Sequence, residues 1–223
     1  MKRFVLSLAA SAAAIALAPA ANAGIFLGYS LDGVTINSLA DLDPSVSNAT
    51  GIGSAGGFDF TLSATGFPTL ASPALTSNTI NAKSENSKTN TLFLYVTQTD
   101  NTAFTGDILS TFTSQLLAGG ASSVTISSFY DTANGLFGGT QMASSTFTTL
   151  DTSAINSAIS AAAPFSTTIR YQLTFTGAGT FNDSAQLAAA VPEPATWGLM
   201  LLGFGAMGGM LRTRRQAPRV RFA

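Results

Sequence analysis

The side chains that could perform covalent chemistry are scarce, and most of them are aspartates. Two pairs lie close together in the chain, Asp41 with Asp43 and Asp100 with Asp107. A glycosidase needs two carboxyl groups on either side of the scissile bond, at a separation that only the fold sets. The sequence contains no histidine and no cysteine, which excludes a serine–histidine pair, a thiolate nucleophile and disulfide bonds. We therefore expect no catalytic residue and predict that the protein is not an enzyme.

The same carboxylates raise the question of calcium, because this ion prefers carboxylate and carbonyl oxygens in loops. Asp41 and Asp43 offer two such groups, but the regular Asp/Asn and Gly spacing of a calcium loop does not follow them. Asp183 has Asn182 beside it and no third ligand close in the chain. Aspartates in loops rich in serine and glycine usually cap turns. We predict no metal ligand and no cofactor.

Charge is distributed unevenly along the 223 residues, with basic ends and an acidic centre. Residues 24–191 carry three basic and ten acidic side chains and therefore a net charge of −7. Nucleic-acid binding needs lysines and arginines that displace counterions from phosphates. We expect no nucleic-acid partner.

The last part of the chain carries a proline motif ahead of an uncharged run. Pro192 and Pro194 flank Glu193, and Trp197 follows three residues after Pro194. Prolines this close together disfavour a regular helix or a central strand around them. We expect an extended, accessible segment here.

Residues 196–211 contain no charged side chain and are rich in Leu, Met and Gly. A helix of this length would cover about 24 Å, a little less than the ~30 Å hydrocarbon core of a bilayer. Arg212, Arg214 and Arg215 follow and would hold this end in the cytoplasm under the positive-inside rule. The pattern predicts a membrane-anchored precursor that is inserted transiently into the inner membrane.

The order of motif, apolar helix and arginine cluster over residues 190–215 resembles a PEP-CTERM sorting domain of the PEPxxWA variety. Gly198 stands where that variety usually has alanine, which is a small change in side-chain volume. The resemblance implies export by a Gram-negative bacterium that makes exopolysaccharide. It also implies that an exosortase-type enzyme recognises and removes the tail, so that the motif residues are a substrate. A plain tail anchor is the alternative.

The N-terminus resembles a secretory signal peptide over residues 1–23. Lys2 and Arg3 precede an apolar stretch, and a small-residue cleavage site follows at Ala21 and Ala23. The apolar stretch is shorter than the ~20 residues of a membrane span. We expect signal peptidase to cut after Ala23 and the exported protein to begin at Gly24.

Composition and periodicity predict that residues 24–190 form an all-β domain. Serine and threonine account for 50 of the 168 residues from 24 to 191, which suits strands with small polar outer faces. Apolar residues alternate in runs separated by glycine-containing turns. The runs are 57–66, 90–99, 122–131, 144–150, 165–179 and 179–189. We predict an antiparallel β-sandwich of about seven to nine strands, although a closed barrel fits the alternation nearly as well.

Four stretches of this domain lack clear alternation. Residues 107–118 and 151–163 look helical or irregular, the second with Asp151 as an N-cap and Pro164 as a stop. Residues 41–57 and 69–90 are polar and are expected to form long loops.

These features predict a secreted cell-surface or extracellular-matrix protein with a structural or adhesive role in association with exopolysaccharide, as in a biofilm or floc. Its predicted parts are a signal peptide (1–23), a β-rich extracellular domain (24–190), a sorting segment (191–215) and a basic cytoplasmic tail (216–223). Two alternatives are a glycan- or calcium-binding surface module and a permanently anchored membrane protein.

Overall fold

The computed structural model describes residues 24–40, 48–66, 74–190 and 193–213, which form two separate units. The first unit ends at Ala189 and consists of ten antiparallel strands, so the predicted all-β class is confirmed. The strands are β1 (Ile25–Ser30), β2 (Asn37–Ala40), β3 (Asn48–Ala55), β4 (Phe58–Gly66), β5 (Ala74–Ser84), β6 (Asn90–Asn101), β7 (Phe104–Asp131), β8 (Thr140–Phe147), β9 (Asp151–Ala161) and β10 (Phe165–Ala189).

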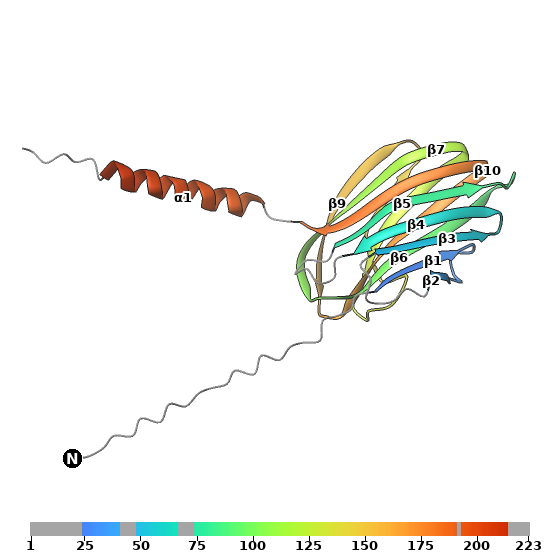
Figure 1. Cartoon of the computed structure of the whole chain (residues 1–223), viewed down its shortest axis with the longest axis horizontal. Helices are drawn as coiled ribbons and strands as arrows, with labels where there is room; N and C mark the ends of the chain where they lie inside the picture. The colour runs from blue at the N-terminus through green and yellow to red at the C-terminus, as the bar shows by residue number, and fades with distance from the viewer. Residues whose placement is uncertain (1–23, 41–47, 67–73, 191–192, 214–223) are drawn as a thin grey trace, which may run out of the picture. The chain divides into compact units, whose positions relative to one another are not determined.

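The strands pair into two layers that share the two longest strands. The first layer has the order β2-β1-β6-β10-β7-β8 and uses the first half of β10 with the second half of β7. The second layer has the order β3-β4-β5-β10-β7-β9 and uses the other halves. Figure 1 shows the strands of this second layer side by side. The architecture is thus the predicted antiparallel sandwich.

The strands β7 and β10 pass from one layer to the other at a bend rich in glycine. Their pairing is interrupted between Phe175 and Gly179 of β10. A Cβ on Gly120 would lie 2.5 Å from the carbonyl carbon of Gly177, and one on Gly179 would overlap the backbone nitrogen of Ala121. The two backbones therefore approach too closely for a side chain at either position. The glycine-containing turn expected between residues 165–179 and 179–189 is instead a bend within the continuous strand β10.

The core lies between the layers and is closed by aromatic contacts across them. The rings of Phe58 on β4 and Phe175 on β10 have centroids 5.3 Å apart. Tyr29 on β1 contacts Phe60 on β4 at 5.2 Å. Burial of such side chains is the main favourable contribution to folding. Both layers are therefore held together by one shared apolar interior.

Both predicted helices are wrong, because these residues form strands. Residues 107–118 belong to β7, and β9 occupies residues 151–161. The buried residues in this part of β7 alternate strictly: Ile108, Ser110, Phe112 and Ser114. Two of the four inward residues are serines, so the apolar residues alone do not reveal the period of two.

The two long loops are also corrected, since β3 lies within residues 41–57 and β5 within residues 69–90. Gly51 and Gly53 made β3 difficult to predict from the sequence, because glycine is uncommon in strands. The fold needs a glycine there: a Cβ on Gly53 would overlap the ring of Phe60. Close packing against an aromatic ring, rather than a turn, explains this residue.

The described part of the second unit contains the helix α1 (Glu193–Thr213). Pro194 lies in its first turn, where the missing N–H of proline removes no hydrogen bond. The expected extended segment is therefore helical from Glu193 onward. Among the described residues, no helix combines the length and the apolar character needed to cross a membrane. Glycines within α1 dilute its apolar residues: Gly198, Gly203, Gly205, Gly208 and Gly209.

Candidate functional site

The structure describes only some of the residues selected from the sequence. Glu193, Pro194 and Trp197 lie in the first turns of α1, and Arg212 lies near its end. The basic tail of residues 216–223 lies outside the described residues. So do Ala21, Ala23, Asp41, Asp43, Pro192, Arg214 and Arg215.

Asp100 and Asp107 are held in different surroundings. Asp100 accepts hydrogen bonds from Asn134 at 2.8 Å and from the Thr99 hydroxyl at 3.0 Å. Asp107 is an exposed residue of β7 and lies opposite Ala158 of β9. The two carboxylates therefore have separate neighbours on separate strands.

Asp183 and Asn182 point to opposite sides of β10. Asp183 is fully buried between the layers, whereas the Asn182 side chain donates to Asn81 at 2.9 Å on the outer face. They cannot act on one ion. Across the described ranges, no three His, Cys, Asp or Glu side chains are grouped to hold a metal.

The outer face of the second layer holds a depression of about 380 Å³. Strands β3, β4, β5 and β10 each contribute to it. Its lining residues are Ile52, Gly53, Ser54, Asp59, Phe60, Thr61, Asn81, Ala82, Lys83 and Thr180. We call this feature the depression.

Strand register places the outward side chains in and beside the depression in two parallel rows. Directly paired residues on neighbouring strands project to the same face of a sheet. The first row is Ser54, Asp59, Lys83 and Thr180. The second row is Ile52, Thr61, Asn81 and Asn182. Each row crosses four strands, so segments far apart in the sequence form one surface.

Lys83 supplies the positive charge of the depression. Its ammonium donates to Glu85 at 2.8 Å, and both side chains are more than half exposed, at 58% and 64%. The hydrogen bond to Glu85 and the charges of Glu85 and Asp59 raise the pKa of Lys83, which keeps it charged. An ammonium has three donors, so the bond to Glu85 leaves it able to donate to a ligand.

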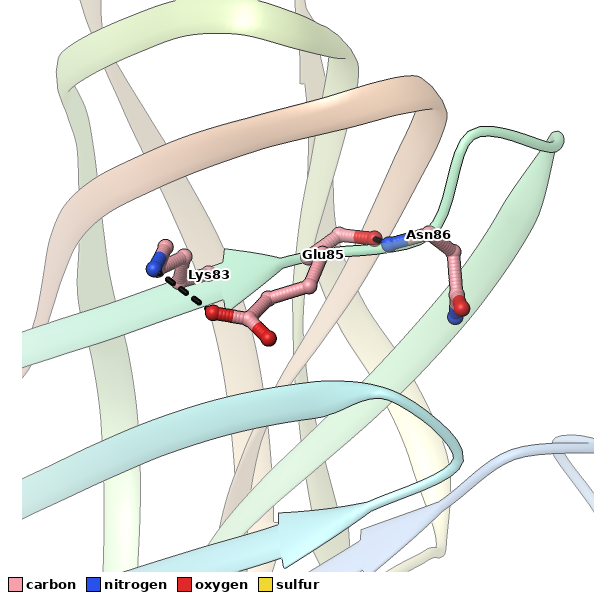
Figure 2. A network of polar contacts seen from close by, with 4 residues as sticks. Lys83, Glu85 and Asn86 are labelled. Carbon is pink, nitrogen blue, oxygen red and sulfur yellow. Dashed lines mark hydrogen bonds and ion pairs between the residues drawn. The ribbon is translucent and has the colours of Figure 1, made fainter.

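A turn next to Lys83 fixes the rim of the depression. Figure 2 shows Lys83 and Glu85 together, with Asn86 following along the chain. The Asn86 side chain donates to the carbonyl of Gly56 at 2.8 Å, and the Glu85 N–H donates to the carbonyl of Gly57 at 3.1 Å. These bonds join the turn after β5 to the turn between β3 and β4. Lys83 and Glu85 therefore lie beside two turns that are joined by hydrogen bonds.

The depression combines donors, acceptors and an apolar edge. The Asn81 amide nitrogen and the Lys83 ammonium can donate hydrogen bonds to a ligand, and the Asp59 carboxylate can accept them. Ile52 is 77% exposed and ends one row with an apolar surface. Such a surface suits a ligand with many hydroxyl groups and some apolar C–H surface. Asn81 and Lys83 fell in a predicted loop, and no local sequence pattern marks them.

Comparison with known proteins identifies the tail. Residues 190–215 match the family model described as the PEP-CTERM protein-sorting motif, which confirms the resemblance. This motif implies a secreted protein that is sorted and processed by an exosortase and associates with the cell surface. No curated protein is significantly similar to the sequence.

Two solved structures are distantly similar to this chain. One is TmCBM61 in complex with beta-1,4-galactotriose, at 11% identity and a TM-score of 0.33, covering 57% of this chain and 87% of that one. The other is the C-terminal CBM6 of LamC, a marine laminarinase from Zobellia galactanivorans. It has 12% identity and a TM-score of 0.25, and the match covers 48% of this chain and 78% of that one. Similarities this weak do not bear on function.

Proposed function

We propose that this protein is a structural or adhesive component of the cell surface or extracellular matrix, and that its β-sandwich binds exopolysaccharide. The sorting motif supports the location, because an exosortase-sorted protein is delivered outside the inner membrane. In this proposal, signal peptidase cuts after Ala23 and the exosortase cuts near Pro192. The sandwich then acts as the exported module.

The observation that carries the binding proposal is the pair of rows, mostly of polar side chains, that crosses the depression. A sugar hydroxyl both donates and accepts hydrogen bonds, so it needs partners of both kinds. Asn81 and Lys83 offer donors within one cross-strand step of Asp59 and Thr61. Ile52 gives a C–H face of a sugar ring an apolar contact. An extended chain of sugars fits an open surface that crosses four strands.

The test is a calorimetric titration of the full chain with exopolysaccharide extracted from its own host. Asn81→Ala and Lys83→Gln should each weaken binding by about fivefold to tenfold, which corresponds to the loss of about one hydrogen bond. Gln115→Ala is a matched amide control, because Gln115 also bonds across strands, to Ser184 at 2.9 Å, but does not line the depression. Lys88→Gln is the matched charge control.

Both controls should bind as the wild type does. Failure of the polysaccharide to bind, or equal affinities for all four variants, would overturn the proposal.

We also propose that the sandwich acts by binding alone, without catalysis. The sequence lacks histidine and cysteine, which removes the commonest general base and thiolate chemistry. Prolonged incubation with the same polysaccharide should release no new reducing ends. Their release would show that the protein cleaves the polysaccharide.

A further inference from the structure

Arg170 is the only arginine of residues 24–190, and it lies on the outer face of the first layer. Its chain neighbours Ile169 and Tyr171 are both fully buried in the core. Because side chains alternate along a strand, Arg170 points away from the core. Strand register places it between Tyr95 of β6 and Ser127 of β7. It therefore lies on the face opposite to the depression.

The guanidinium of Arg170 is positioned by an aromatic ring rather than by a carboxylate. Its central carbon lies 5.0 Å from the ring centroid of Phe129, a cation–π contact. Its Nε is buried and has no hydrogen-bond partner. Among the described residues, the ion pair is that of Lys83 with Glu85, and Arg170 takes part in none. The charge is thus held in place without being neutralised.

Tyr95 supplies a second donor next to Arg170. The rings of Tyr95 and Phe137 pack edge-on, with their centroids 5.8 Å apart. The Phe137 N–H donates a hydrogen bond to the Thr97 hydroxyl at 3.0 Å, which holds Phe137 in place beside Tyr95. Burial raises the pKa of Tyr95, the charge of Arg170 partly opposes this shift, and the charge of Asp32 adds to it, so the Tyr95 hydroxyl stays protonated. A neutral phenol can donate a hydrogen bond to an anion.

A guanidinium that makes no ion pair within the described residues, packed on an aromatic ring beside a phenol, is suited to a planar carboxylate. We propose that Arg170 and Tyr95 bind the carboxylate of a uronic acid in an acidic polysaccharide. The net charge of −7 on residues 24–191 does not prevent this. Distant charges are screened beyond about 8 Å at physiological ionic strength, whereas a direct ion pair acts at contact. This site is separate from the depression and does not depend on it.

The test compares an oligogalacturonate with the neutral oligogalactan of equal length, each titrated into the full chain. The wild type should bind the acidic oligomer at least about tenfold more tightly. Arg170→Gln should abolish this preference, and Arg170→Lys should reduce it severalfold because lysine lacks the planar fork. Tyr95→Phe keeps the ring and should reduce binding of the acidic oligomer about threefold to tenfold.

Lys88→Gln removes one exposed positive charge elsewhere and should leave the preference unchanged. Tyr95→Phe keeps the proposal testable if the arginine variants fail to fold, which their unfolding midpoints will report. Equal binding of acidic and neutral oligomers by the wild type, or an unaltered preference in Tyr95→Phe and Arg170→Lys, would overturn it. Variants of the depression report on the proposed function independently.

Discussion

At the scale of single residues, Asp183 combines a titratable group with full burial. It has no exposed surface, and neither carboxylate oxygen has a hydrogen-bond partner within the described ranges. Tyr171, Ser77 and Ser114 are also buried and leave hydroxyl oxygens without partners. Burial raises the pKa of Asp183 from 3.8 to about 7, and Ser114 partly opposes this shift. The neutral carboxyl is the form that this interior accommodates.

Asp183 should make the stability of the fold depend on pH. Since its native pKa lies above its unfolded value, its stabilising contribution is complete below about pH 4 and is lost as the pH rises through about 7. The free energy of unfolding should therefore fall by roughly 2–3 kcal/mol between about pH 5 and about pH 8. Urea unfolding of the wild type and Asp183→Asn at both pH values measures this.

In the Asp183→Asn variant, this fall in the free energy of unfolding between about pH 5 and about pH 8 should disappear, since an amide does not titrate. Asp107→Asn, at an exposed position of β7, should keep the wild-type slope. Parallel pH profiles for the wild type and Asp183→Asn would show that the carboxyl does not titrate between these values in the folded protein.

At the scale of elements, the bend shared by β7 and β10 joins the two layers into one body. Gly120 lies at a close approach of the two backbones, and a Cβ there would lie 2.5 Å from Gly177. Backbone cannot move aside as a flexible side chain can. The bend is therefore a position where even one methyl group should disturb both sheets.

Gly120→Ala should lower the free energy of unfolding by about 1–3 kcal/mol, as expected for overpacking. Gly138→Ala is the matched control, because a Cβ at Gly138 would meet nothing within 4 Å. This control should change stability by less than about 0.5 kcal/mol or raise it slightly. Chemical denaturation measures both, and equal midpoints would contradict the close approach at the bend.

At the scale of the whole molecule, the sandwich and the tail have separate tasks. The sandwich presents the depression on one outer face and Arg170 on the other. If both bind, one protein would link a hydroxyl-rich chain to an acidic chain. The tail acts earlier, as the sorting motif that an exosortase reads.

Intact-mass spectrometry of the protein from its host tests both ends. The extracellular wild type should begin at Gly24 and end near Pro192. Replacing Pro192 and Pro194 together with alanine should block processing and retain the mass through Ala223, because the motif is the substrate. Pro218→Ala changes a proline beyond Arg215, outside the sorting segment, and should be processed normally. An extracellular wild-type species that still ends at Ala223 would contradict the role of the tail.

Local sequence patterns were sufficient to predict the all-β class and to recognise the sorting motif. Alternation with a period of two and the spacing of Pro192, Glu193, Pro194 and Trp197 can be read from neighbouring residues alone. The strands that the sequence did not predict depend on distant partners. Gly53 packs against the ring of Phe60, and the hydroxyl groups of Ser110 and Ser128 share a hydrogen bond of 2.9 Å between the layers.

Only the tertiary structure decided which residues share a surface. Asn81 reaches Asn182 across 101 positions of sequence, and Arg170 lies on Phe129 because β10 and β7 pair in one register. Strand order and register are set by how all inward side chains pack at once. A short stretch of sequence determines the form of its own backbone, whereas a binding surface in an antiparallel sandwich belongs to strands that meet only after folding.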